Sequence, residues 1–177
     1  MVTKHQKIKI DLSSKYSDAE KTAIAEDIID FIIDRTQLKN LDRNNARFKK
    51  YSEIYINSQK FKAAGKSIND FNLTLDEDML SAMKTLDIES DGVVIGFEKG
   101  TPENAKADGN IRGTYGKDKS TGKGRDFLGI TKKDLKTILS DYPLRTTKKG
   151  KTAEDVRLRT EERREGKEGR SSLAEVP

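Results

Sequence analysis

The chain has 177 residues, of which 37% are charged and only 33% are hydrophobic, so a compact core can include only part of its length. It contains no cysteine, which excludes disulfides, thiolate metal sites and thiol nucleophiles, and no apolar run approaches the roughly 18 residues of a membrane span. With 35 basic and 30 acidic residues, the net charge of +5 describes a mixed surface, so we expect a soluble intracellular protein without a dense positive field.

The first predicted elements are a strand and a long helix. Apolar and polar residues alternate over residues 7–12, which predicts a half-buried strand. Ser17 and Glu20 form a capping-box pattern, which predicts a helix from there to about Arg35. The helix is unusually apolar, so we expect it to be covered on two sides, by a sheet and by a neighbouring element or subunit. Its apolar residues are Ile24, Ile28, Ile29, Phe31, Ile32 and Ile33.

The next part of the chain is more polar. Residues 40–50 lack periodicity and predict a loop. Apolar residues then return at helical spacing from Tyr51, which predicts a short helix ended by Gly65. After an extended piece over residues 72–75, Asp76 can cap a further helix that carries Met79, Leu80 and Met83.

A hairpin and two helices are predicted beyond this point. The Asp91–Gly92 pair stands between apolar runs, which is the pattern of a hairpin turn. Pro102 is suited to the first position of a short helix over residues 102–110. Thr131 can cap a last helix over residues 131–142, which Pro143 ends and which turns Leu135, Ile138 and Leu139 inward.

Between these two helices lies a glycine- and lysine-rich loop, residues 113–124. It is longer than a compact domain usually holds unless the loop has a function or is disordered. From position 112 to position 125 there are five basic residues and one acidic residue, a local charge of +4. Such a patch can meet phosphates or an acidic protein surface, and a solvated loop is an equally good interpretation. The basic residues are Arg112, Lys117, Lys119, Lys123 and Arg125.

The composition changes after Pro143. Residues 143–177 hold ten basic and seven acidic residues and no aromatic residue, so they have little apolar area to bury. A helix over about residues 152–165 is predicted from its Arg and Glu pairs, but it could not stay folded alone. We therefore expect a domain at 1–142 and a charged C-terminal extension at 143–177. The extension is expected to dock on a partner through Val156 and Leu158.

Patterns for catalysis are weak. Gly116 to Gly124 superficially resembles a phosphate-binding loop. However, five residues separate Gly116 from Gly122 where the pattern requires four, and Gly124 stands where the pattern requires a serine or threonine. His5 is the only histidine, so neither a zinc site nor a Ser-His-Asp set is expected. We expect a protein with no catalytic residue, no metal and no cofactor.

The segment Gly124–Thr131, with the sequence GRDFLGIT, carries the most specific signal. It resembles the Arg-x-Phe-Leu-Gly-Leu/Ile-Ser/Thr segment of the virion-morphogenesis, or tail-completion, proteins of tailed bacteriophages. Other pieces follow in the order of that family over about residues 20–142. They are Asp27–Arg35, Phe48–Tyr55, Leu73–Leu75 with Met79 and Leu80, and the hairpin strand Val93–Phe97. The chain departs from the family at Asp126, where proline is usual, and at Ala105–Asn110, where histidine and an aromatic residue are common.

The resemblance implies an α+β domain, with helices packed on a small, mainly antiparallel sheet, that forms a ring at the phage neck or tail end. A homo-oligomeric hexamer is favoured over a dodecamer. Its expected neighbours are a neck or connector protein, a tail tube or sheath protein and DNA in the channel. No contact with a membrane is expected. The expected location is the virion, after assembly in the host cytoplasm. The main alternative is a basic nucleic-acid-binding protein.

Ten residues are candidates for this role. We expect Phe127 and Leu128, an apolar pair flanked by glycines, to anchor the end of the basic loop on the domain. The hypothetical subunit or partner interface consists of Arg112, Tyr115, Lys117, Lys119, Lys123, Arg125, Val156 and Leu158.

Overall fold

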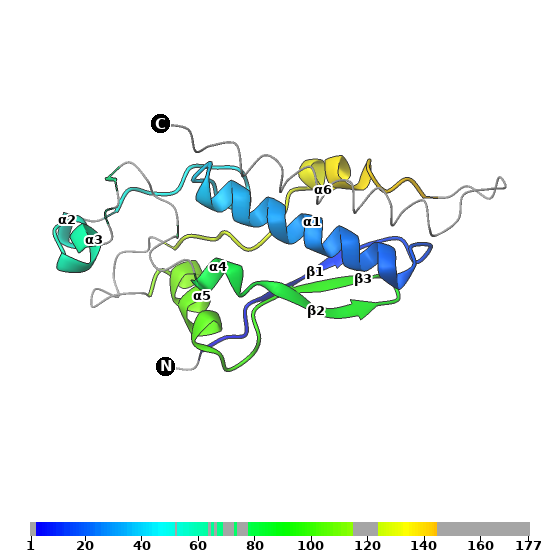
Figure 1. Cartoon of the computed structure of the whole chain (residues 1–177), viewed down its shortest axis with the longest axis horizontal. Coiled ribbons are helices and arrows are strands. Elements are labelled where there is room, and N and C mark those ends of the chain that lie inside the picture. The colour runs from blue at the N-terminus through cyan, green and yellow to red at the C-terminus, as the bar shows by residue number, and fades with distance from the viewer. Residues whose placement is uncertain are drawn as a thin grey trace, which may run out of the picture. The chain divides into compact units, whose positions relative to one another are not determined.

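The computed structural model describes residues 3–51, 53–63, 65, 67–68, 73, 78–114 and 124–144. The chain divides into two units, Met1–Leu144 and Arg145–Pro177. The helix predicted over about 152–165 lies outside the described residues, which end at Leu144. The described part is an α+β domain (Figure 1). Its elements are β1 (Lys7–Asp11), α1 (Asp18–Gln37), α2 (Glu53–Ile56), α3 (Gln59–Ala63), α4 (Asp78–Ser81), β2 (Lys84–Glu89), β3 (Gly92–Gly96), α5 (Pro102–Arg112) and α6 (Lys132–Leu139).

The sheet has three antiparallel strands in the order β1-β3-β2, which places β3 in the centre. The hairpin between β2 and β3 is confirmed, but its turn lies one residue earlier than the Asp91–Gly92 pair suggested. Gly92 is already the first residue of β3 and pairs with Glu89. A Cβ atom at Gly92 would lie 2.4 Å from the backbone oxygen of Ile10. Glycine is therefore needed here for the close approach of β1, not for the turn itself.

The long helix α1 begins with the predicted capping box. Ser17 accepts from the backbone N–H of Glu20, and the Glu20 side chain accepts from the backbone N–H of Ser17. The helix packs on β2 and β3 on one side and on α6 on the other (Figure 1), which confirms that it is covered on two sides. Its centre is fully buried, as expected for an apolar helix inside the core. The residues with no exposed surface are Ile24, Ala25, Ile28 and Ile32.

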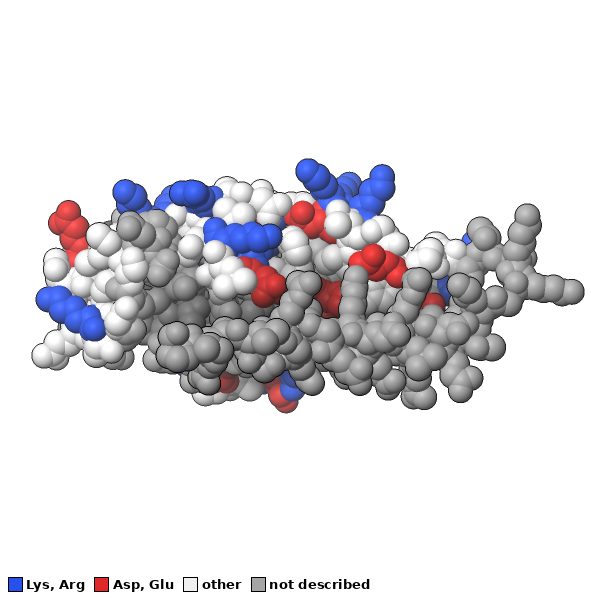
Figure 2. All heavy atoms as spheres, turned by 45° about the horizontal axis from the view of Figure 1, so that its top comes forward, with Lys and Arg blue, Asp and Glu red and all other residues white. Residues whose placement is uncertain are grey.

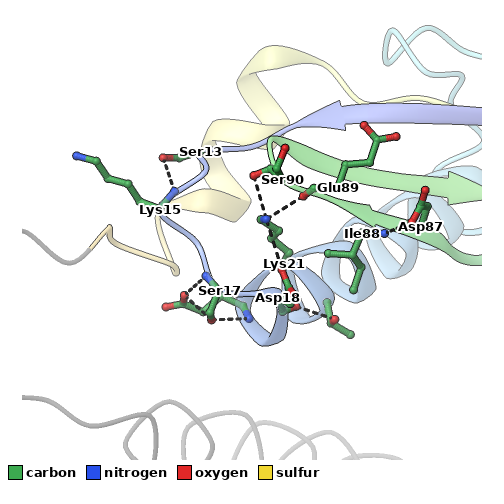
Figure 3. Close-up of polar contacts among 11 residues, drawn as sticks. Ser13, Lys15, Ser17, Asp18, Lys21, Asp87, Ile88, Glu89 and Ser90 are labelled. Atoms are coloured by element: carbon green, nitrogen blue, oxygen red, sulfur yellow. Dashed lines mark hydrogen bonds and ion pairs between the residues drawn. The ribbon is translucent and has the colours of Figure 1, made fainter.

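A buried lysine joins α1 to the hairpin. Lys21 is only 3% exposed, and its Nζ donates to the backbone oxygens of Glu89 at 2.8 Å and Ser90 at 3.0 Å (Figure 3). The exposed carboxylate of Asp18 lies 3.6 Å from the same Nζ. The ammonium group thus satisfies two carbonyls at the hairpin turn, and its aliphatic stem covers apolar surface.

We expect Lys21→Met to lower the free energy of unfolding by about 1–2 kcal/mol, because two carbonyls lose a charged donor while the apolar stem is kept. Urea unfolding followed by circular dichroism measures the change. Lys15→Met is the matched control, because Lys15 is exposed at the same end of the helix (Figure 3) and should cost little. Equal stability of the two variants would show that the carbonyl contacts of Lys21 do not contribute.

The N-terminal segment is fastened to α5 by buried polar groups. Pro102 occupies the first turn of α5, as predicted, and Thr101, which the sequence analysis did not name, caps the helix. The helix continues to Arg112, two residues beyond the predicted end, and Gly113 caps it with a left-handed φ of 67°. The backbone N–H of Gln6 donates to Asn104 Oδ1, and Gln6 Nε2 donates to Asp108 Oδ1, each at 2.8 Å. Both acceptors are 2% exposed. These contacts fix the entrance to β1 against the helix that precedes the basic loop.

Three predicted helices differ in extent. Where one short helix was expected from Tyr51, the structure has two, α2 and α3, followed by Gly65 with a left-handed φ of 61°. The helix α4 ends at Ser81, so Met83 follows it rather than lying on it. The last helix ends at Leu139, and its inward residues pack against the core without being fully buried. Ser140 is its C-cap, with Oγ donating to the backbone oxygen of Thr137, so the helix ends before Pro143 is reached.

Candidate subunit interface

Both ends of the basic loop meet at the C-terminus of α5. The backbone N–H of Arg125 donates to the backbone oxygen of Asn110 at 2.8 Å. A Cβ atom at Gly124 would lie 2.3 Å from the backbone oxygen of Ile111, so only glycine allows the returning chain to come this close. The loop therefore leaves α5 and returns to it at one place. The residues Tyr115, Lys117, Lys119 and Lys123 lie outside the described part of the chain.

The two anchor residues lie in the core. Phe127 has no exposed surface and Leu128 is 3% exposed. The ring of Phe127 packs edge-on against Phe97, with ring centroids 6.1 Å apart and an interplanar angle of 78°. This geometry is favourable for aromatic pairs and joins the end of the basic loop to the residue that follows β3.

The backbone of the segment is held by a buried arginine. Arg35, near the end of α1, is 1% exposed, and its Nη2 donates to the backbone oxygen of Phe127 at 2.6 Å. Burial lowers the pKa of the Arg35 guanidinium, while the negative charges of Asp134, Asp42 and Asp126 act against that shift. Sequence reasoning missed this residue, because a single arginine at a helix end is usually solvated.

Asp126 joins this segment to the loop that follows α1. Its carboxylate pairs with Arg43 Nε at 3.0 Å, and its backbone oxygen accepts from the backbone N–H of Arg43 at 2.9 Å. The side chain of Arg43 also lies against Gly129, where a Cβ atom would meet its Cδ at 3.0 Å. Asp126 therefore ties the segment to the loop after α1, a contact that proline could not make with its side chain.

The N-terminus of α6 completes the segment. Thr131 caps the helix, as predicted, by accepting from the backbone N–H of Asp134 at 3.1 Å. Asp134 also accepts from Thr131 Oγ1 at 2.6 Å and from Asn45 Nδ2 at 2.8 Å. Partial burial works to raise the pKa of Asp134, but these hydrogen bonds together with the positive charges of Arg35 and Lys133 hold the pKa below its usual value.

Arg125 has partners within its own chain. Its guanidinium lies over the ring of Tyr51, 4.5 Å from the centroid, and its Nη2 donates to the backbone oxygen of Lys49 at 3.3 Å. Burial lowers the pKa of this guanidinium. Tyr51 in turn packs with Tyr55 and Phe61 at centroid distances of 5.0 and 5.7 Å. Arg125 thus links the loop to the small aromatic cluster of α2 and α3, and its contact with a neighbouring subunit stays a prediction.

We expect Arg125→Ala to leave the domain folded while lowering the free energy of unfolding by about 0.5–2 kcal/mol, the range of a cation–π contact. Arg125→Lys should recover only part of this, because an ammonium lacks the planar surface that stacks on a ring. Urea titration with tyrosine fluorescence is suitable, since the chain has no tryptophan. A variant as stable as the parent would show that the contact with Tyr51 contributes nothing.

Arg112 is also engaged within the chain. Its Nη2 pairs with Asp108, one helical turn earlier on α5, and Asp108 also binds Gln6. Its interface role, like that of Arg125, stays a prediction. The candidates Val156 and Leu158 lie outside the described residues.

Three further features concern the histidine, possible metal ligands and the charges on the surface. His5 Nε2 lies 2.7 Å from the backbone oxygen of Phe97, so that nitrogen donates a hydrogen bond. Within the described ranges, no group of three His, Asp or Glu side chains is placed to hold a metal ion. Figure 2 shows lysine and arginine side chains interleaved with aspartate and glutamate on the face it draws.

No helix in the part of the chain that the structure describes is long and apolar enough to cross a membrane.

Comparisons of the chain with protein-family models, with curated proteins and with solved structures find no match.

Proposed function

We propose that the chain is a structural virion protein of the phage neck, at the head–tail junction, which assembles as a ring. The ring joins or terminates the tail and connects it to the head connector. The observation that carries this proposal is the base of the basic loop. The segment that resembles the tail-completion family is also the segment that closes the loop against α5, through Gly124 and Arg125, and anchors it in the core through Phe127.

The mechanism of such a protein is geometric rather than catalytic. Because the base of the loop is fixed, every copy carries its loop at the same place, so a ring presents identical loops in a regular array. Each basic loop makes weak contacts with the next ring, and many such contacts add through multivalency. A hexamer is favoured over a dodecamer. The neighbours are a neck or connector protein, a tail tube or sheath protein, and DNA in the channel.

Two features favour assembly over the alternative of a basic nucleic-acid-binding protein. The charged side chains on the surface in Figure 2 are of both signs, which differs from the dense positive face that phosphate binding favours. Two of the basic residues beside the loop, Arg112 and Arg125, also have partners within the chain. Their guanidinium groups are therefore already engaged, by Asp108 and by the ring of Tyr51 respectively.

Negative-stain electron microscopy of the purified protein, together with a DNA mobility-shift assay over a range of salt concentrations, tests the proposal. Closed rings of uniform diameter, and antibody labelling at the neck of the particles, are expected. A protein that stays monomeric at every concentration and shifts DNA with a steep salt dependence would instead establish the nucleic-acid-binding alternative.

A further inference from the structure

The loop that follows α1, residues 40–48, closes on itself and lies against the start of α6. The backbone N–H of Phe48 donates to the backbone oxygen of Asn40 at 3.0 Å, which brings the two ends of the loop together. Near the middle of the loop, Asn45 Nδ2 donates to Asp134 Oδ2, in the first turn of α6, at 2.8 Å. The loop and the first turn of α6 therefore form one surface.

Seven exposed cations lie on and beside this surface. Lys39 and Lys49 flank the two ends of the loop, and Lys132 and Lys136 lie about one turn apart on α6. In the part of the chain that the structure describes, none of the seven forms an ion pair. We call these residues the Lys132 face. They are Lys39, Arg47, Lys49, Lys50, Lys132, Lys133 and Lys136.

The acidic residues on the same two segments are fewer, and each is already bound. Residues 39–50 and 126–136 together hold eight basic and three acidic residues, a net charge of +5. Asp42 accepts from two backbone N–H groups of its own loop, at 2.8 and 2.9 Å, and Asp126 pairs with an arginine of that loop at 3.0 Å. Asp134 accepts from two side chains. Among the described residues, the Lys132 face therefore has no carboxylate of its own that neutralises it.

The charges on the face that Figure 2 draws are sorted rather than evenly mixed. Blue side chains gather along the upper border, over α6 and over the chain that follows α1, and most of the red ones lie below them (Figures 1 and 2). The surface as a whole carries both signs, but one part of it is positive. A local positive field of this kind attracts polyanions, and the attraction weakens as salt is added.

Duplex DNA is the partner whose chemistry fits this face. Six of the seven cations are lysines, which act as flexible point charges and do not require a fixed bidentate geometry. Such contacts go to phosphate oxygens and carry no sequence information. An acidic protein would have to place carboxylates opposite two separate segments at once, whereas a phosphate backbone supplies negative charge continuously.

We propose that the Lys132 face binds the phosphate backbone of duplex DNA without reading its sequence. In the proposed ring this DNA is the duplex that passes through the channel. That location rests on the proposed function, whereas the binding itself does not. Because the net charge of the face is small, the contact is weak and sensitive to salt, unlike that of a dedicated nucleic-acid-binding protein.

Charge reversal with a matched control tests the contact. The face variant carries Lys49→Glu, Lys132→Glu and Lys136→Glu. The control variant carries Lys7→Glu, Lys15→Glu and Lys99→Glu, which make the same change in net charge at exposed positions outside the face. Circular dichroism checks that both variants fold. Replacing the same three face lysines by glutamine removes their charge without reversing it, and provides a second, milder variant.

Fluorescence anisotropy with two labelled duplexes of unrelated sequence, over a series of KCl concentrations, measures binding. Wild-type protein should bind the two duplexes with equal affinity, because phosphates are the same in both. The face variant should lose at least about tenfold in affinity, and the salt dependence of the glutamine variant should fall by about 0.9 per phosphate contact removed. The control variant should stay within about threefold of wild type, because long-range charge is screened at these salt concentrations.

The outcomes separate this inference from the proposed function. Equal losses in the face and control variants would refute the Lys132 face as the binding surface, and so would wild-type rings that bind neither duplex at low salt; the ring function would stand in both cases. Protein that binds DNA through this face but forms no ring in negative stain would refute the ring and leave the DNA contact standing. Tighter binding of poly-L-glutamate than of DNA, lost only in the face variant, would show that the face fits an acidic protein and would overturn the proposal.

Discussion

Phe127→Ala is expected to destabilise the domain by about 3–5 kcal/mol, the usual cost of removing a fully buried phenylalanine ring. Phe127 has no exposed surface, and its ring packs edge-on against Phe97. The truncation would leave a cavity at the point where the basic loop is anchored, next to the carbonyl that Arg35 binds. Chemical denaturation monitored by circular dichroism measures the loss.

Two controls make the result specific. Phe127→Leu keeps most of the volume and should cost less than about 1.5 kcal/mol. Phe31→Ala removes the same group from a half-buried site on α1 and should cost clearly less than Phe127→Ala. If Phe127→Ala were no more harmful than Phe31→Ala, Phe127 would not be an anchor and the proposed fixed base of the loop would lose its support.

Ile28→Ala is expected to lower the free energy of unfolding by about 2–5 kcal/mol. Ile28 lies in the middle of α1 with no exposed surface and belongs to the buried core cluster. The truncation would leave a cavity that the surroundings cannot easily fill, because the neighbouring core residues Ile24 and Ile32 are equally buried and closely packed.

Ile33→Ala on the same helix is the control, since Ile33 is only partly buried and should cost less. Both variants are compared by urea unfolding with tyrosine fluorescence. A change within roughly 0.5 kcal/mol for Ile28→Ala would place this side chain at the surface and refute the assignment of α1 as the centre of the core.

The site illustrates where sequence reasoning stops. The pattern GRDFLGIT identified the segment. Phe127 and Leu128 could be predicted to be buried because they are an apolar pair in a polar region, and both are buried. The partners of the segment did not follow from any pattern. Arg35 is 92 positions away from Phe127, and Lys49 is 76 positions away from Arg125. Such contacts depend on how the chain returns to itself, which local spacing does not encode.

Phe48 shows the same limit within a loop. Residues 40–50 read as polar and irregular, and most of them are exposed, yet Phe48 is 5% exposed and belongs to the core. A bridge between Leu41 and Arg47 and the hydrogen bond from Phe48 N–H to Asn40 close the loop and turn the ring inward. A single aromatic residue has no periodicity, so its direction cannot be predicted.

The sequence alone determined where a helix begins wherever residues close in the sequence supply the capping hydrogen bonds. The caps Ser17 and Thr131 bond to backbone groups three residues away, and Pro102 suits a first helical turn, so the starts of α1, α6 and α5 could be predicted. Only the tertiary structure decided which charged groups are buried and why Gly92 must be glycine. Lys21, Arg35 and Gly92 meet backbone atoms of distant segments, and the free energy of each contact depends on desolvation and close approach that exist only in the folded chain.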